Sequence, residues 1–505
     1  MDCAHPQPPR RQRSHGLGRP PRLGHNPATG PRREDRTPIR PFFSPPHRSA
    51  KPAAGAPLAQ SPQPGVSARQ APPTPEKIVQ NVVEIRPPGG YISAMIPRHI
   101  SARLLEALAD TPVVLLHGAR QTGKSTLVQH ITSSDHPARY LTLDDTVVLA
   151  AATADPPGFL AGLEGPVALD EVQRVPELFV AIKVDVDRDR RAGRYLLTGS
   201  ANVLTLPKLS KSLAGRMEIL PLWPLSQGEI EGCREGFLDA VFKSRPLKVT
   251  RAAESKGRLI DRVLLGGFPE ACARSGSNRR RAWFNSYVTT ILQRDVRDLA
   301  NIEGLSAMPR LLALLASRIG CLLNHADISR SLAMPQTTLK RYMALLEATF
   351  LVQLLPPWSS NVGKRLVKAP KLYLNDTGLA ASLLGQDSAR ALKNSQLLGP
   401  LVENFVVMEL RKQIIWSETQ PAMFHFRTLT GQEVDVVLES PSGEVVGVEI
   451  KTSVTVGSDD FNGLRVLADQ AGKRFVRGIV LYGGAEVVPF AKRMHAVPLN
   501  LVWRA

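Results

Sequence analysis

Residues 118–125 read Gly118-Ala119-Arg120-Gln121-Thr122-Gly123-Lys124-Ser125 and match every fixed position of the pattern GxxxxGK[ST]. The run follows the apolar residues 113–116 and leads into Ser125-Thr126-Leu127-Val128-Gln129-His130-Ile131. Strand, glycine-rich turn and helix therefore come in the order that a phosphate-binding loop requires. At average residue frequencies, a chance match in a chain of this length is on the order of one per cent. We expect this stretch to bind a nucleoside triphosphate.

The chemistry of such a loop explains its residue types. Glycines allow consecutive backbone N–H groups to point at phosphate oxygens, and the helix N-terminus adds a favourable partial charge. Lys124 is expected to reach the β- and γ-phosphates, and Ser125 to coordinate Mg²⁺. The residues expected to bind ATP are Gly118, Gln121, Thr122, Gly123, Lys124, Ser125 and Thr126.

Two further apolar runs end in polar residues suited to the same site. The segment 167–171 ends in Asp170 and Glu171, and residues 194–200 end in Thr198-Gly199-Ser200. Parallel strands deliver their carboxyl ends to the phosphate crevice. We expect Asp170 to hold the Mg²⁺ shell, Glu171 to polarise the attacking water, and Ser200 to sense the γ-phosphate.

Arg216, in Ser212-Leu213-Ala214-Gly215-Arg216, is expected to act in trans on the nucleotide of a neighbouring subunit. Arg194 is the alternative. Either arginine predicts a homo-oligomer.

These landmarks together resemble the AAA-type ATPases, and in particular one bacterial and archaeal family with a long, largely uncharacterised C-terminal extension. The resemblance runs from about Met95 to the end and implies an α/β P-loop core, ATP and Mg²⁺ as cofactors, and ATP hydrolysis. Further marks of that family follow in three stretches: 264–270 (LLGGFPE), Tyr287 through Arg294-Asp295-Val296, and 368–379 (KAPKLYLNDTGL).

Composition favours an intracellular protein of several domains. The 505 residues exceed the size at which a single core keeps growing. Four isolated cysteines form no spacing suited to zinc or to a disulfide framework. The sequence has no apolar stretch that approaches a bilayer span and no secretory signal. We therefore expect a cytoplasmic protein without a transmembrane segment, and peripheral membrane contact stays open.

The net charge of +19 is unevenly distributed. Residues 1–94 carry 14 basic and 5 acidic residues, a net of +9, and hold 20 of the 42 prolines. This composition predicts a disordered Pro/Arg-rich tail. Met95-Ile96-Pro97-Arg98-His99 resembles the usual start of the family, so the tail is either an added arm or the product of a start codon assigned too far upstream.

The middle of the chain is expected to be helical. Leu311, Leu312, Leu315 and Ile319 recur at helical spacing, and two shorter helices at 326–332 and from Gln336 follow. This layout is typical of a winged-helix unit, which contacts either DNA or protein. The basic run Lys364, Arg365, Lys368 and Lys371 fits DNA contact and equally a solvated face.

The last part contains a second set of chemical groups. Residues 433–438 and 445–451 alternate as two strands of a hairpin, which places Glu449 and Lys451 on one face. With a suitable register Asp435 joins them, and Glu403 comes from the preceding helix. This set looks like the PD-(D/E)xK nuclease pattern, in which Glu403, Asp435 and Glu449 would bind Mg²⁺ and Lys451 would orient water. Such folds also occur without activity.

The predicted organisation has five parts. They are a disordered tail (1–94), an AAA-type ATPase core (95–235), a helical lid or linker (236–300), a winged-helix-like part (301–360) and an α/β nuclease-like domain (361–505). Two functions stay open. Either the nucleotide cycle of an ATPase controls a DNA-handling, nuclease-like domain, or the chain is a nucleotide-dependent switch whose C-terminal domains bind a protein partner.

Overall fold

The computed structural model describes residues 96–200, 213–243, 254–295, 305–365, 368–386 and 388–504. The predicted tail 1–94, Met95 and Val296 lie outside these residues. The described residues all belong to one compact unit, 78–505. None of their helices combines the length and the apolar character that a membrane span requires.

The N-terminal part is built on a five-stranded parallel sheet with the strand order β2-β3-β4-β1-β5. Its strands are β1 (Val113–His117), β2 (Arg139–Thr142), β3 (Val167–Asp170), β4 (Tyr195–Gly199) and β5 (Met217–Pro221). Strands of a parallel sheet are covered on both faces and so read as continuous apolar runs. The strands β1, β3 and β4 are buried throughout, which confirms the strands predicted at 113–116, 167–170 and 194–197.

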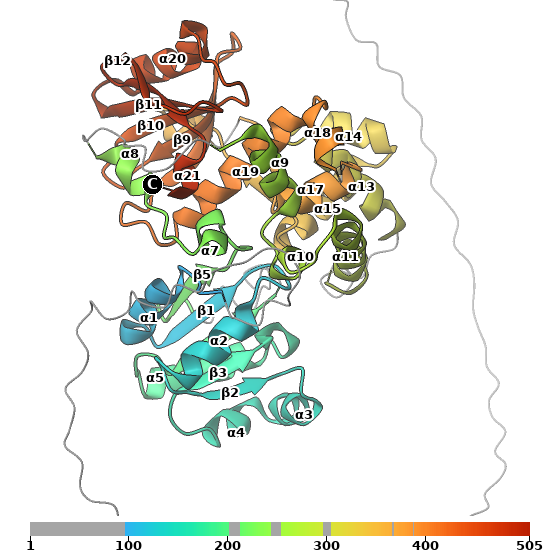
Figure 1. Ribbon diagram of the computed structural model, residues 1–505. Coiled ribbons are helices and arrows are strands. Elements are labelled where there is room, and N and C mark those ends of the chain that lie inside the picture. The colour runs from blue at the N-terminus through green and yellow to red at the C-terminus, as the bar shows by residue number, and fades with distance from the viewer. Residues whose placement is uncertain are drawn as a thin grey trace, which may run out of the picture. The chain divides into compact units, whose positions relative to one another are not determined.

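Helices cover both faces of this sheet (Figure 1). They are α1 (Ser101–Asp110), α2 (Lys124–Ser133), α3 (Thr146–Ala154), α4 (Pro156–Ala161) and α5 (Leu178–Arg188), with the 3₁₀ turn η2 (Val172–Arg174). Val114 and Leu116 of β1 pack with α1 and α2. Val113 and Leu115 pack with the apolar residues of α3, α4 and α5 on the opposite face. The mixed α/β class with a parallel sheet is thus confirmed.

Helices dominate the middle of the chain. They are α7 (Gln227–Glu231), α8 (Phe237–Phe242), α9 (Lys256–Leu265), α10 (Pro269–Cys272), α11 (Ser277–Thr290), α13 (Met308–Ala316), α14 (His325–Leu332), α15 (Gln336–Ala348), α16 (Val362–Arg365), α17 (Thr377–Leu383) and α18 (Ala389–Lys393), with the π-helical turn η4 (Ile291–Asp295) and the 3₁₀ turn η5 (Leu305–Ala307). An antiparallel pair, β6 (Val352–Leu355) and β7 (Lys371–Leu374), follows α15.

The three helices predicted between residues 308 and 348 are confirmed as α13, α14 and α15. Leu339, Met343 and Leu346 of α15 are buried, and Lys340 and Arg341 are exposed on its other face. The assignment of this part as a winged helix, and its contact with DNA or protein, stay predictions.

The C-terminal part begins with α19 (Leu398–Gln413) and contains a six-stranded mixed sheet of order β12-β13-β11-β10-β9-β8. Its elements are β8 (Ala422–Arg427), β9 (Glu433–Glu439), β10 (Val445–Ile450), η6 (Ser458–Phe461), α20 (Asn462–Ala471), η7 (Gly472–Arg474), β11 (Phe475–Tyr482), β12 (Val488–Ala491), β13 (Met494–Pro498) and α21 (Leu501–Arg504). The predicted hairpin is confirmed as β9 and β10, which are antiparallel. The nuclease-like assignment of this fold stays a prediction.

Two of the family marks pack against each other. The backbone N–H of Gly267 donates to Asp376 over 2.7 Å, and the N–H of Leu225 donates to the carbonyl oxygen of Gly267 over 2.7 Å. A Cβ atom at Gly267 would lie 2.3 Å from the Leu225 carbonyl oxygen, so no side chain fits there. The stretches 264–270 and 368–379 therefore join the end of the ATPase part to the helical middle.

Candidate functional site

The phosphate loop connects β1 to α2 and has the backbone that its sequence predicts. Gly123 has a φ of 92°, in the left-handed region that favours glycine, and it precedes the first residue of α2. At Gly118 a Cβ atom would lie 2.2 Å from the carbonyl oxygen of Leu222. Thr122 steadies the turn, because its hydroxyl donates to the carbonyl oxygen of Ala119 over 3.0 Å.

Lys124 lies inside this loop. Its side chain is buried, and its ammonium group donates to the carbonyl oxygens of Gly118 at 3.0 Å and of Ala119 at 2.8 Å. The charge is therefore held among the backbone groups of the loop, where phosphate oxygens are expected.

Asp170, at the carboxyl end of β3, accepts hydrogen bonds from three hydroxyl groups. Ser125 donates over 2.9 Å, Tyr140 donates over 2.7 Å, and Thr198 donates to the other carboxylate oxygen. Burial and the bond to Asp170 raise the pKa of Tyr140 well above its ordinary value, so its hydroxyl stays a donor. Sequence analysis paired Ser125 with Asp170 but missed Tyr140, since nothing local to β2 distinguishes it.

Glu171 follows Asp170 and has a φ of 58°, which is unusual for a residue with a side chain. Its carboxylate accepts from the Ser200 hydroxyl over 3.0 Å and from the amide of Gln173, which also donates to Ser200 over 2.9 Å. Its backbone N–H donates to the hydroxyl of Thr198 over 3.0 Å. The structure thus brings Glu171 and Ser200 together beside Asp170 and adds Gln173, which the sequence analysis did not identify.

Arg98, which precedes α1, contacts the backbone of the phosphate loop. Its guanidinium group donates to the carbonyl oxygens of Thr122 and Trp223, each over 2.7 Å, and forms an ion pair with Glu229 at 3.0 Å. Side chains at both ends of this pair are almost fully buried. In the sequence, Arg98 stands out only as part of the stretch 95–99, and its contact with the phosphate loop was not predicted.

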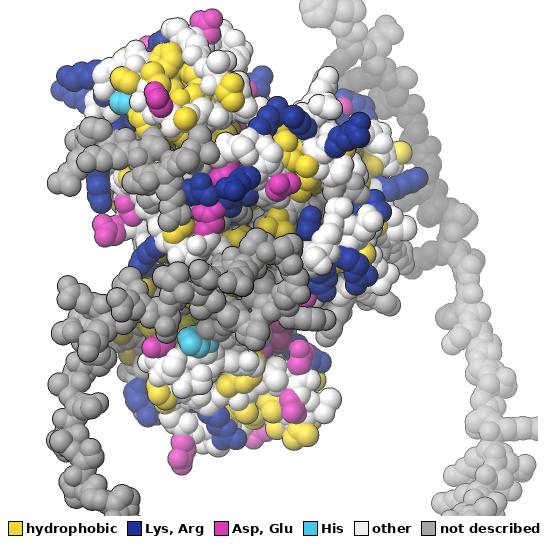
Figure 2. Space-filling view, in the orientation of Figure 1, with side chains coloured by type: hydrophobic (Ala, Val, Ile, Leu, Met, Phe, Trp, Pro, Cys, Tyr) yellow, Lys and Arg dark blue, Asp and Glu magenta, His cyan; other side chains and the backbone are white. Residues whose placement is uncertain are grey.

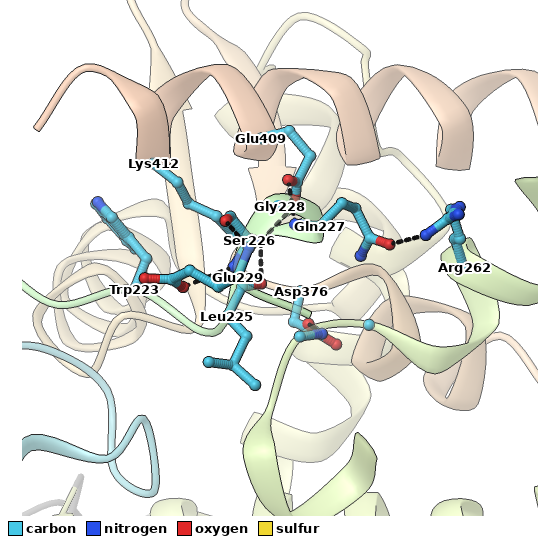
Figure 3. A network of polar contacts seen from close by, with 12 residues as sticks. Trp223, Leu225, Ser226, Gln227, Gly228, Glu229, Arg262, Asp376, Glu409 and Lys412 are labelled. Carbon is cyan, nitrogen blue, oxygen red and sulfur yellow. Dashed lines mark hydrogen bonds and ion pairs between the residues drawn. The ribbon is translucent and has the colours of Figure 1, made fainter. Parts of the chain in front are cut away.

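A network of polar contacts continues from Glu229 to α19 (Figure 3). Glu229 and Ser226 form a capping box at the start of α7, and the backbone N–H of Gln227 donates to Glu409 of α19 over 2.8 Å. Lys412 of α19 donates to the carbonyl oxygen of Leu225 over 2.9 Å. The first residue of α7 and the turn before this helix therefore each bind one buried side chain of α19.

The phosphate loop and the residues around Asp170 lie in a stretch that matches a known family. Residues 110–231 match the AAA domain, and residues 256–390 and 398–502 match two domains of unknown function (DUF8612 and DUF4143). An uncharacterized protein of Mycobacterium tuberculosis and one of Mycobacterium bovis are each 34% identical over 422 residues, which is 83% of this chain and 88% of each relative. The chain belongs to their family. It is an AAA-type protein with a P-loop ATPase domain.

Two solved structures have limited similarity to part of the chain. The Walker-type ATPase of Pyrococcus abyssi is 17% identical, with a TM-score of 0.37 over 57% of this chain and 96% of that chain. The RuvB Holliday junction branch migration motor of Thermotoga maritima is 18% identical, with a TM-score of 0.25 over 52% of this chain and 90% of that chain.

The two candidate arginines lie away from the phosphate loop of their own chain. Arg216 precedes β5, and the register of β5 with β1 places it at the amino end of the sheet, whereas the loop follows the carboxyl end. There it pairs with Asp187 at 2.5 Å. Arg194 is buried and donates to the carbonyl oxygens of Leu163 and Gly165, so it is not exposed to a neighbouring subunit.

The four predicted residues of the C-terminal site form two neighbouring groups, and a fifth residue, Lys371, contacts two of them. Its ammonium group pairs with Glu403 of α19 at 3.0 Å and with Asp435 of β9 at 2.9 Å. The backbone N–H of Ile450, between Glu449 and Lys451, donates to Asp435 over 3.0 Å. Lys451 pairs with Glu449 of β10 at 3.0 Å. Burial and then the Asp435 carboxylate raise the pKa of Glu403 to about 7 and that of Glu449 to about 8.

The structure differs from the sequence predictions for the basic run and for the C-terminal metal site. The solvated face proposed for the basic run is wrong for Lys371, which is 2% exposed because it neutralises the cluster, and for Arg365, which pairs with Glu439 at 2.6 Å. The side chain of Lys364 lies outside the described residues. The metal site of Glu403, Asp435 and Glu449 differs from expectation, because Lys371 bridges the first two. Across the described residues no three acidic, His or Cys side chains are placed to hold a metal ion.

Proposed function

We propose that the chain hydrolyses ATP at the site formed by the phosphate loop, Asp170, Glu171 and Ser200. The observation that carries this proposal is the bond between Ser125 and Asp170 beside the pair Glu171 and Ser200. A hydroxyl and a carboxylate are the hard oxygen ligands that Mg²⁺ prefers. Ser125 and Asp170 would hold Mg²⁺, which when bound neutralises charge on the phosphate oxygens.

The other residues have separate tasks in this proposal. Lys124 supplies a fixed positive charge to the transferred phosphate, where charge builds up in the transition state. Glu171 orients and polarises the attacking water, and Gln173 and Ser200 fix the position of its carboxylate. Measurement of phosphate release from ATP, with Mg²⁺ and after addition of EDTA, tests this proposal. We expect release with Mg²⁺ and its loss with EDTA. Hydrolysis that is unchanged by EDTA would reject the proposal.

The nucleotide cycle is proposed to act on the C-terminal part through α19. Arg98 and Glu229 join the phosphate loop to α7, and Glu409 and Lys412 join α7 and its preceding turn to α19. The same helix carries Glu403 of the second cluster. These buried polar contacts form a continuous path from the phosphate loop to α19. A change in the conformation of the loop on nucleotide binding would therefore reach α19 through them. Amide hydrogen exchange of α19 with and without ATP tests this step, and unchanged exchange would reject it.

A second candidate function is DNA handling by the C-terminal part. It is favoured by the convergence of Glu403, Asp435, Glu449 and Lys451 on neighbouring elements. Nicking of DNA with Mg²⁺ or Mn²⁺ that is lost in Asp435→Ala and in Lys451→Ala supports cleavage. Stimulation of ATP hydrolysis by DNA without nicking supports binding alone. If DNA has neither effect, a protein partner for the C-terminal domains is favoured.

A further inference from the structure

A pocket separate from the phosphate loop lies where five helices meet. Its volume is about 610 Å³, and α7, α9, α11 and α18 line it together with Arg504 of α21. Figure 2 shows Lys and Arg side chains next to Asp and Glu side chains on the face where α9 and α21 lie. Pockets that bind small molecules have volumes of about 300 to 1,000 Å³. The size therefore suits a small ligand.

The lining of this pocket has an excess of positive charge. Four arginines line it, against the carboxylates of Glu231 and Asp261; they are Arg258, Arg262, Arg280 and Arg504. Arg262 and Arg504 share the carboxylates of Glu231 and Glu254. Arg258 and Arg280 pair with no carboxylate in the part of the chain that the structure describes. Arg280 donates to the carbonyl oxygen of Arg274 over 3.3 Å. Its other N–H groups and the guanidinium group of Arg258 are available to an anion.

The N-terminus of α11 adds to this charge. The helix has 14 residues and begins at Ser277, which lines the pocket. It follows Gly276, has no side-chain cap and has no acidic residue in its first turn. The N–H groups of a helix N-terminus carry a partial positive charge that favours anions. Arg280 lies on the same first turn.

The buried residue Gln227 also lines this pocket. Gln227 is 1% exposed, and its amide oxygen accepts from Arg262 over 2.8 Å (Figure 3). Because arginine only donates, the oxygen must face Arg262, and the Nε2 group must point elsewhere. That group has no hydrogen-bond partner among the described residues. The Nε2 group is buried and not accessible from the pocket, so Gln227 positions Arg262 in the lining and does not itself bind a ligand.

We propose that this pocket binds a small organic phosphate, at a site distinct from the nucleotide site. Guanidinium groups donate pairs of parallel hydrogen bonds to phosphate oxygens, and the N-terminus of α11 supplies further donors. A phosphate group on Arg258 and Arg280 gives both guanidinium groups a counter-charge. Gln227 lies at the contact between α7 and α19, because its backbone N–H donates to Glu409, so the ligand would bind beside this contact.

Calorimetric titration of the full chain with inorganic pyrophosphate tests the proposal. The protein carries Lys124→Ala, so that the phosphate loop does not contribute to binding. We expect one equivalent to bind, and Arg280→Gln to weaken the affinity at least tenfold. Arg279→Gln is the matched control, since Arg279 lies on the same helix, is exposed and does not line the pocket. It should bind as the parent does.

Three outcomes would overturn the proposal. They are no binding of pyrophosphate to the Lys124→Ala protein, equal affinities of the Arg279→Gln and Arg280→Gln variants, and binding of citrate at least tenfold tighter than pyrophosphate. The last outcome would show a site for carboxylates. Thermal unfolding of both arginine variants verifies that each is folded before titration, and Arg258→Gln provides a second test from α9 if Arg280→Gln does not fold.

Discussion

Arg98 donates a hydrogen bond of 2.7 Å to the carbonyl oxygen of Thr122, so a side chain from the segment before α1 holds the phosphate loop in place. The loop sequence alone does not show this dependence. The same guanidinium group neutralises Glu229, which caps α7. The backbone of the nucleotide site and the start of α7 therefore share one buried cation.

Replacement of Arg98 by Met should affect both stability and nucleotide binding. Burial would raise the pKa of Glu229, but Arg98 holds it below its ordinary value, and the variant leaves this carboxylate buried without its cation. Removal of one partner of a buried pair costs about 3 to 5 kcal/mol. We expect a loss of that order in urea denaturation, together with weaker ATP binding. Arg103→Met removes the partly exposed pairs with Glu106 and Glu218 and should cost less, about 1 kcal/mol. Equal costs for the two variants would contradict this account of Arg98.

His117, the last residue of β1, should make the fold sensitive to acid. Burial, with a smaller effect of Lys124, lowers its pKa to about 4. The unfolded chain takes up a proton near pH 6.5, so the stability that His117 contributes is full above that pH and is lost as the pH falls toward 4. The loss of stability between pH 7 and pH 5 should be about 2 kcal/mol smaller in His117→Asn than in wild type. Chemical denaturation at both pH values measures it, and equal losses in the two proteins would show that His117 is not responsible.

Arg216 should act only between subunits. It lies at the opposite end of the sheet from the loop of its own chain, and it is partly exposed beside Asp187. An arginine that completes the site of a neighbour contributes about 10³ to 10⁵ in rate. Arg216→Ala should lose hydrolysis, and mixing it with Lys124→Ala should restore part of it, because mixed interfaces contain one intact site. Full activity of Arg216→Ala alone would remove this residue from the reaction.

Lys371 should be replaceable, in part, by a divalent cation. Burial opposes its charge, but Asp435 and Glu403 hold the pKa of Lys371 above its ordinary value. Lys371→Met leaves two buried carboxylates without their cation, which should cost about 3 to 5 kcal/mol. If these carboxylates are able to bind metal, Mg²⁺ or Mn²⁺ should raise the melting temperature of the variant more than that of wild type. Lys368→Met, at an exposed position, is the control. Equal shifts in all three proteins would count against a metal site at Glu403, Asp435 and Glu449.

The sequence predicted the parts of the site that local patterns determine. The phosphate loop, the strand ends at Asp170 and Ser200, and the hairpin that carries Asp435 and Glu449 follow from spacing within short stretches. Parallel strands end at the same edge, so Asp170 and Ser200 were expected to lie near each other, and Ser200 bonds to Glu171, the residue that follows Asp170.

Residues that act through distant contacts were not predictable in this way. Arg98 and Glu229 are 131 positions apart, Tyr140 and Asp170 are 30 apart, and Lys371 and Asp435 are 64 apart. Each of these pairs depends on how helices and strands pack, and no short pattern contains both members. Lys371 shows the consequence, since a lysine in a basic run reads as exposed until its two carboxylates are placed beside it.

The most direct test of the central claim compares ATP binding and ATP hydrolysis in three proteins: wild type, Lys124→Ala and Glu171→Gln. Lys124 supplies charge to the phosphates, whereas Glu171 serves the attack of water. We predict that Lys124→Ala loses ATP binding, and that Glu171→Gln binds ATP as tightly as wild type but hydrolyses it at least a hundredfold more slowly. Binding and hydrolysis by Lys124→Ala equal to those of wild type would contradict the assignment of the ATPase site.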